Sequence, residues 1–200
     1  MLSAPTYHAL SNVQFLLAET ALLAERRLRG DSWTDLKLEA QEGQLFGKTR
    51  PASQGTILTA LKARLEGQPS EVLELLYQGS LEARQILNLA LTLQHRRVLS
   101  RFMTDVLISK WQAFDPRVTD AEVRGFLSHL ADQEQEVAAW SEDTTEKTRS
   151  NITRFLQDAG VLRRTGRGQF EVVPQYLTAS VGSVLERHVP KVLRLLEALR

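Results

Sequence analysis

The residues best suited to chemistry in this sequence are cations gathered in one short stretch. Between Thr144 and Gly168 there are six basic residues and two acids, so this stretch carries a net charge of +4 in a chain of net charge +1. The stretch just before it, residues 115–143, holds eight acids against two arginines, a net charge of −6. Concentrating positive charge in this way favours a polyanionic partner, because phosphate contacts supply much of the affinity of proteins for nucleic acid.

The first half of the basic stretch predicts an amphipathic helix. Asp143 is the predicted N-cap with Glu146 three residues later, and Gly160 is the predicted C′ residue. At 100° per residue the apolar side chains share one face, and the opposite face carries groups that can contact phosphates or base edges. The helix residues predicted to bind DNA are Lys147, Arg149, Ser150, Asn151 and Arg154, with Arg149 nearest the buried edge.

A β-hairpin is predicted directly after this helix. The apolar residues Val161, Leu162, Phe170, Val172 and Val173 flank the turn Thr165-Gly-Arg-Gly168. A glycine-flanked arginine at a hairpin tip can reach a minor groove or the flanking backbone, which adds Arg163, Arg164 and Arg167 to the predicted DNA-binding residues. The order helix, helix, hairpin is that of a winged helix. A solvated surface helix beside an ordinary hairpin is the alternative interpretation.

Helical periodicity dominates the remainder of the chain. The predicted helices cover residues 9–29, 33–42, 51–65, 71–78, 81–94, 96–113 and 120–140, and Pro190 is expected to open or kink the last helical segment. The fold class is therefore mainly α: a helical bundle with winged-helix or helix-turn-helix units and one small β-hairpin wing. The predicted domains are an N-terminal helical domain (1–114), a C-terminal winged helix (115–176) and a C-terminal helical segment (177–200).

A second helix-turn-helix is conceivable at residues 9–66. Lys48 and Arg50 precede its third helix, Lys62 and Arg64 stand near the end of that helix, and the stretch that contains them holds no acid. Bases at the ends of a helix favour phosphate contact over base reading, so Lys48 and Arg50 are also predicted to bind DNA. A plain three-helix packing unit is an equally good interpretation of this region.

Composition and motifs argue against several classes of function. The chain has no cysteine, which excludes disulfides and thiolate zinc sites, and its four histidines are dispersed without the spacing of metal ligands. No nucleotide-binding loop or nucleophile motif occurs, so we expect no enzymatic activity, no cofactor and no metal. No stretch approaches the roughly 20 apolar residues that a membrane span needs, and no signal peptide is indicated. We therefore expect a cytoplasmic protein that does not contact a membrane.

Three segments, by their order and character, carry a family resemblance. They are Ser141–Leu162, the run LLAETALLAERRLRGDSW at residues 16–33, and Lys48-Thr-Arg-Pro-Ala-Ser. Together they resemble the BrxA family, the small helical component of BREX (bacteriophage exclusion) defence systems, over nearly the full length of the chain. The resemblance implies a cytoplasmic protein encoded beside a methyltransferase, a phosphatase-like protein and ATPases, and it implies phage restriction together with marking of self DNA.

The same resemblance implies DNA binding through winged-helix parts. The segment match carries over Lys147, Arg149, Ser150, Asn151 and Arg154, whereas the hairpin arginines depend on the residues alone. The family's likeness to the helical antitermination factor NusB keeps RNA as a less favoured partner. We therefore expect a non-enzymatic accessory component that binds double-stranded DNA, with other BREX components as further candidate partners. The alternatives are a winged-helix transcription regulator with a palindromic site, a protein–protein adaptor and an RNA-binding protein.

Overall fold

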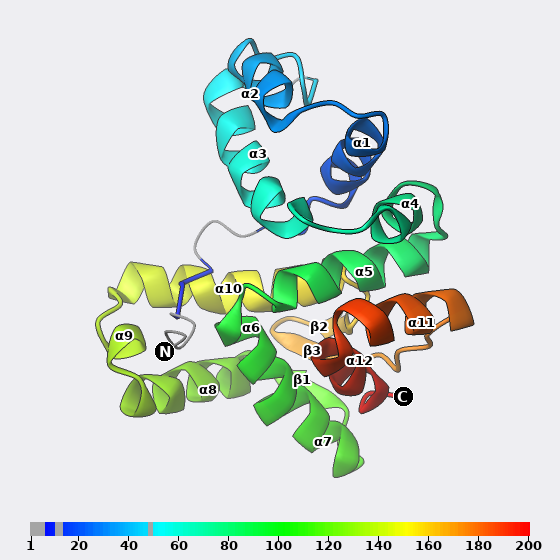
Figure 1. Ribbon diagram of the computed structural model, residues 1–200. Helices are drawn as coiled ribbons and strands as arrows, with labels where there is room; N and C mark the ends of the chain where they lie inside the picture. The colour runs from blue at the N-terminus through cyan, green and yellow to red at the C-terminus, as the bar shows by residue number, and fades with distance from the viewer. Residues whose placement is uncertain (1–6, 11–13, 48–49) are drawn as a thin grey trace, which may run out of the picture. The chain divides into compact units, whose positions relative to one another are not determined.

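Helices account for most of the computed structural model, which describes residues 7–10, 14–47 and 50–200 (Figure 1). The chain divides into two compact units. We call Leu16–Leu91 the inserted unit, and we call Thr92–Arg200 with the N-terminal residues up to Phe15 the main unit. The domain boundaries predicted at residues 114 and 176 stay predictions.

All the regular secondary structure described for the inserted unit is helical. Its helices are α1 (Leu17–Leu28), α2 (Trp33–Gln41), α3 (Pro51–Leu65), α4 (Ser70–Gln78) and most of α5 (Leu81–Leu93). Helix α1 packs against α4, and α2 packs against α3. Pro51 occupies the first turn of α3 as predicted, where its missing N–H costs no hydrogen bond.

The helix predicted over residues 9–29 is wrong in its first half. Helix α1 begins at Leu17, and residues 7–10 and 14–16 are not helical, while residues 11–13 lie outside the described part of the chain. The apolar residues before Leu17 match a helical pattern, but Tyr7, Leu10 and Phe15 are buried in the main unit instead. Tertiary packing here overrides a pattern that local sequence alone favours.

The helices of the main unit surround one small sheet (Figure 1). They are α6 (Arg97–Phe102), the π-helix η1 (Met103–Ile108), α7 (Ser109–Gln112), α8 (Asp120–Gln133), α9 (Gln135–Ala138), α10 (Glu142–Asp158), α11 (Ala179–His188) and α12 (Pro190–Glu197). Pro190 opens α12 as predicted. The single helix predicted over 120–140 is wrong, because the extended backbone of Glu134 (φ −129°, ψ 109°) separates α8 from α9.

The sheet has three antiparallel strands in the order β1-β3-β2, formed by β1 (Arg117–Thr119), β2 (Leu162–Gly166) and β3 (Gln169–Val172). Strands β2 and β3 are the predicted hairpin, so a mainly α fold with one small hairpin is confirmed. Strand β1 was not predicted. It pairs Val118 with Phe170, and both side chains are buried against the helices.

Edge-on aromatic pairs join α10 to Phe15 and α6 to α8 within the main unit. Phe155 meets Phe15 edge-on with ring centroids 5.1 Å apart, and Phe102 meets Phe126 in the same way at 5.2 Å. Such pairs add to the free energy gained from burying the rings. The apolar face of α10 is therefore fixed, which leaves its other face for contacts outside the protein. No helix in the described part of the chain combines the length and apolar character that crossing a membrane requires.

Candidate nucleic-acid interface

Capping interactions fix where helix α10 begins and ends. The Ser141 hydroxyl accepts a hydrogen bond from the Thr144 N–H at 3.2 Å, so the N-cap is Ser141 and not Asp143 as predicted. Asp143 lies instead in the first turn, where the helix dipole favours negative charge. At the other end Gly160 has a φ of +75°, and the N–H groups of Gly160 and Val161 donate to Gln157 and Leu156 at 3.0 and 2.9 Å. This is the glycine-ended helix terminus that the sequence predicted.

Three predicted contact residues lie on the exposed face of α10: Lys147, Ser150 and Arg154. Lys147 Nζ lies 2.7 Å from Asp143 Oδ2, and the two side chains are 57% and 73% exposed. An ion pair this exposed contributes about 0–1 kcal/mol. Lys147 can therefore exchange its carboxylate partner for a phosphate at little cost.

Arg149 occupies a different environment from these three residues. Its side chain is 16% exposed, and it binds Asp120 Oδ1 at 2.7 Å and the Glu146 carboxylate. Hydrogen bonding to Arg149 lowers the pKa of Glu146, and the same bonds raise the pKa of Arg149. A phosphate would have to compete with two carboxylates for this guanidinium, so the structure favours a structural task for Arg149.

Asn151 is also engaged inside the protein. Its Nδ2 donates to the Leu10 carbonyl at 2.6 Å, and the neighbouring Thr148 hydroxyl accepts from the Leu10 N–H at 3.2 Å. We call residues 7–10 the N-terminal strap. Tyr7 fixes its outer end, because the Tyr7 N–H donates to Glu136 at 2.6 Å and the Arg97 guanidinium lies 4.0 Å from the centre of its ring. The Asn151 side chain, which was predicted to bind DNA, therefore holds the N-terminal strap instead.

The hairpin presents its three arginines in different ways. Arg163 binds Glu171 on the adjacent strand at 2.6 Å. Arg164 is exposed, and its Nε donates to the Gly166 carbonyl at 3.2 Å, which fixes the side chain along the strand. Arg167 is exposed in the turn between the strands. Neither Arg164 nor Arg167 forms an ion pair with another described residue.

The tip of the hairpin is tied to α8. The Asp120 N–H donates to the Gly168 carbonyl at 2.9 Å, and the Asp120 carboxylate binds Arg149 on α10. Gly168 has a φ of +65°, and a Cβ at this position would lie 2.8 Å from Asp120 Oδ2. The sequence could not have revealed this connection, because it joins residues of three different elements. It links α10 to the hairpin tip through Arg149 and Asp120.

We expect Gly168→Ala to lower the free energy of unfolding by about 1–2 kcal/mol, because alanine is strained at positive φ and its Cβ would collide with Asp120. Urea unfolding measures the change. Gly182→Ala in α11 is the control, since a Cβ there meets nothing within 4 Å. This control should instead stabilise the helix by up to about 1 kcal/mol. Equal stability of Gly168→Ala and the wild type would contradict the described hairpin tip.

A polar cleft of about 370 Å³ lies between α10 and the hairpin. Its lining includes Ser150, Arg154 and Asp158 from α10 and Arg164 from β2. We call it the α10–hairpin cleft. It unites residues that the sequence placed on two separate elements, and it brings Arg154 and Arg164 to one site beside Arg149. Asp158 is a further member that was not among the predicted site residues.

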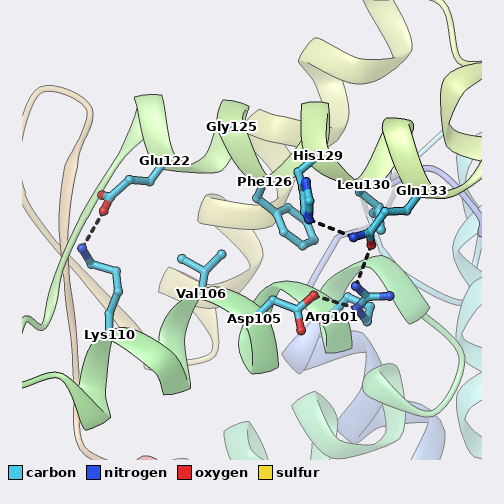
Figure 2. Close-up of a pocket in the computed structure, with 10 residues that line it drawn as sticks. All are labelled: Arg101, Asp105, Val106, Lys110, Glu122, Gly125, Phe126, His129, Leu130 and Gln133. Carbon is cyan, nitrogen blue, oxygen red and sulfur yellow. Dashed lines mark hydrogen bonds and ion pairs between the residues drawn. The ribbon is translucent and has the colours of Figure 1, made fainter.

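A second cavity, of about 330 Å³, has a different character (Figure 2). Val106, Phe126 and Leu130 line it with apolar surface, and Lys110 binds Glu122 at 2.5 Å at one end. At the other end Arg101 of α6 binds Asp105 of η1 at 2.7 Å. Lys110 and Arg101 each bind a carboxylate, so this cavity is poorly suited to a polyanion. No group of three or more described His, Asp or Glu side chains could hold a metal ion.

The inserted unit offers fewer cations than the sequence suggested. Arg50 is exposed just before α3, whereas Lys48 lies outside the described residues. Arg64 is buried and donates to Asn88 at 3.4 Å, so it cannot make the phosphate contact that its place near the helix end indicated. Lys62 Nζ lies 3.4 Å from Glu66 Oε1 and 5.8 Å from the centre of the Trp33 ring, so this cation already has partners within the inserted unit.

Comparison with known proteins places these observations in a family context. A family model described as BrxA matches residues 7–189. The BREX protein BrxA of Bacillus cereus (strain H3081.97) is 23% identical over 147 residues, which is 74% of this chain and 73% of that protein. The crystal structure of an uncharacterized protein from Magnetospirillum magneticum superposes with a TM-score of 0.81 at 18% identity, over 98% of this chain and all of that chain. The last similarity concerns the fold alone.

Proposed function

Since this chain belongs to the BrxA family of BREX phage-defence components, we propose that it serves defence by binding double-stranded DNA and catalyses no reaction itself. The observation that carries the proposal is the meeting of exposed cations from α10 and the hairpin at one cleft. We further propose that it acts in the cytoplasm and positions other BREX components on DNA.

The order of elements supports a winged-helix mode of binding. Strand β1, helix α8, the short helix α9, helix α10 and the hairpin follow one another, and the sheet order is β1-β3-β2. In a winged helix the second helix of the pair enters the major groove and the hairpin reaches the flanking backbone. Helix α10 would be that helix, and the turn at Arg167 would be the wing.

The dimensions of the basic face fit a DNA groove. Lys147 and Arg154 are seven residues apart on α10, and at 1.5 Å per residue this corresponds to roughly 10 Å along the axis. The major groove is about 12 Å wide, so the two side chains can reach phosphates near its two edges. The long side chains of Lys147 and Arg154 are suited to phosphate oxygens, and phosphate contacts should therefore outweigh base contacts.

A salt titration tests the proposal. Fluorescently labelled duplexes of unrelated sequence, a palindromic duplex and a single-stranded RNA of equal length are titrated with the protein between about 50 and 200 mM salt. We expect the duplexes to bind alike and the RNA to bind more weakly. Three phosphates, one at Lys147, one at Arg167 and one shared by Arg154 and Arg164, which line the same cleft, would give a slope of log K against log salt of about −2.7.

Other outcomes identify other functions. Strong preference for one palindromic duplex would indicate a transcription regulator. Tighter binding of RNA than of any duplex would indicate an RNA-binding protein. Absence of duplex binding at the lowest salt would contradict the proposal and would favour an adaptor whose basic surface meets an acidic protein.

A further inference from the structure

The α10–hairpin cleft holds an uneven set of charges. Three arginines and two acids line it. Arg149 binds Asp120 at 2.7 Å and also binds Glu146, which does not line the cleft, so the charge of Arg149 is already neutralised. This leaves Arg154 of α10 and Arg164 of β2 with a single carboxylate, that of Asp158. The remaining charge of the cleft is +1, which suits one singly charged anion.

Hydrogen-bond donors from both α10 and the hairpin line the cleft. Arg164 uses its Nε on the Gly166 carbonyl at 3.2 Å, which orients the guanidinium and leaves its two terminal nitrogens for a ligand. Arg154 and Ser150 approach from α10, one turn apart on the same face. Donors from two elements can therefore reach different oxygens of one phosphate, and charged partners shorten and strengthen such bonds.

Asp158 is poorly placed for the stability of its own helix. It lies at the end of α10, where the helix dipole disfavours negative charge. Loss of hydration at the carboxyl raises the pKa of Asp158, and the nearby Arg154 lowers it only in part. The Asp158 carboxylate attracts Arg154, which an incoming anion would also need.

We propose that the α10–hairpin cleft binds one phosphate group of the DNA backbone, and that Asp158 limits its affinity by competing with the phosphate for Arg154. The inference deepens the proposed function, because it names the group bound at that interface and a residue that weakens it. Removing the Asp158 charge should therefore tighten binding, the opposite of what substitution of an interface residue usually does.

The test compares Asp158→Asn with Asp132→Asn, a control of equal charge change at an exposed position of α8 that does not line the cleft. Binding of a labelled duplex is measured by anisotropy at fixed salt. We expect Asp158→Asn to bind about fivefold more tightly than the wild type, which corresponds to a charge interaction of roughly 1 kcal/mol. Asp132→Asn should change the affinity less than about twofold, since exposed charges at a distance are screened.

Inorganic phosphate is the second probe, because it tests the cleft without DNA. In NMR titrations of the full chain, phosphate should give saturable shifts at the amides of Ser150, Asp158 and Gly168. Asp158→Asn should lower the phosphate concentration at half-saturation, and Arg154→Gln with Arg164→Gln should abolish saturation. Shifts that are linear in phosphate, or equal in all variants, would indicate an adventitious ion only and would overturn the inference.

The pH dependence of duplex binding supplies a third readout. The groups that face Asp158 across the cleft are Arg154 on its own helix, Arg164 on β2 and the Arg149–Asp120 pair. Protonation removes the competing charge, so duplex binding by the wild type should tighten as the pH falls towards the raised pKa of Asp158. Asp158→Asn should lack this part of the pH dependence. Identical pH profiles would count against the competition.

Failure of the inference and failure of the proposed function give different results. A wild type that binds duplexes, with Asp158→Asn no tighter than Asp132→Asn, would refute the competition and retain DNA binding. Saturable phosphate binding that Asp158→Asn tightens, in a protein that binds no duplex, would retain the phosphate site and refute the proposed function.

Discussion

Replacing Lys147 and Arg154 together with glutamate is expected to weaken duplex binding on the order of 100-fold at low salt, from two lost charge-assisted contacts of about 1.5 kcal/mol each. Both side chains are exposed on one face of α10, and neither contributes to the core. The slope of log K against log salt should become shallower by about 0.9–1.8, because the phosphate at Lys147 is lost and the phosphate that Arg154 shares with Arg164 is held less well. Anisotropy titrations over the salt series measure both quantities.

The fold of this double variant should survive. Lys147→Glu places a like charge four residues from Asp143, and Arg154→Glu does the same with Asp158. Each such pair costs a helix about 0.2–0.5 kcal/mol, which is small against the stability of a domain. Circular dichroism should therefore report unchanged helicity, and loss of binding can be assigned to the surface.

The matched control reverses two charges elsewhere in the main unit. Lys191 and Arg194 are exposed on α12, so replacing both with glutamate changes the net charge of the protein by the same amount. This control should weaken binding far less, because long-range repulsion is screened beyond roughly 10 Å at 0.1 M salt. Equal loss of affinity in the two double variants would show that α10 is not the interface.

Local sequence signals were sufficient for the parts of the interface that local contacts determine. The apolar face of α10, the glycine that ends it and the glycine-rich turn of the hairpin all depend on residues within a few positions of one another. The cap was misplaced by two residues because Ser141 and Asp143 are both good N-cap types. The structure resolves the choice through the Ser141 hydroxyl.

Long-range contacts account for what the sequence could not reveal. Asn151 and Arg149 have side chains suited to DNA, but their partners are Leu10 and Asp120, which are distant in the chain. Strand β1 is too short to show an alternating pattern, and it becomes a strand only by pairing with β3. Residue type indicated what each of these side chains could bind, and the fold decided which of them reach solvent.

The break between α8 and α9 has the same kind of cause. Glu134 leaves the helical conformation, and its carboxylate binds Arg97 of α6 at 3.3 Å. Glu136 on α9 accepts the Tyr7 N–H of the N-terminal strap. Both acids thus serve partners from other elements, and a continuous helical pattern in the sequence contains no sign of either contact.

Leu10→Ala is expected to lower the free energy of unfolding by about 2–5 kcal/mol, the range for a leucine truncated in a core. Leu10 is 0% exposed although it lies in the strap and not in a helix. Its backbone is held on both sides by α10, through Thr148 and Asn151. The truncation therefore leaves a cavity that the strap cannot close by moving. Urea unfolding followed by circular dichroism measures the loss.

Leu38→Ala is the matched control, because Leu38 is 54% exposed on α2 and loses the same atoms. Its effect should remain within about 0.5 kcal/mol, as for other surface substitutions. Equal effects of the two variants would mean that the strap does not pack on α10, and the internal task assigned to Asn151 would then fail as well. Asn151 would become available for DNA again, so this stability measurement also decides which α10 side chains belong to the interface.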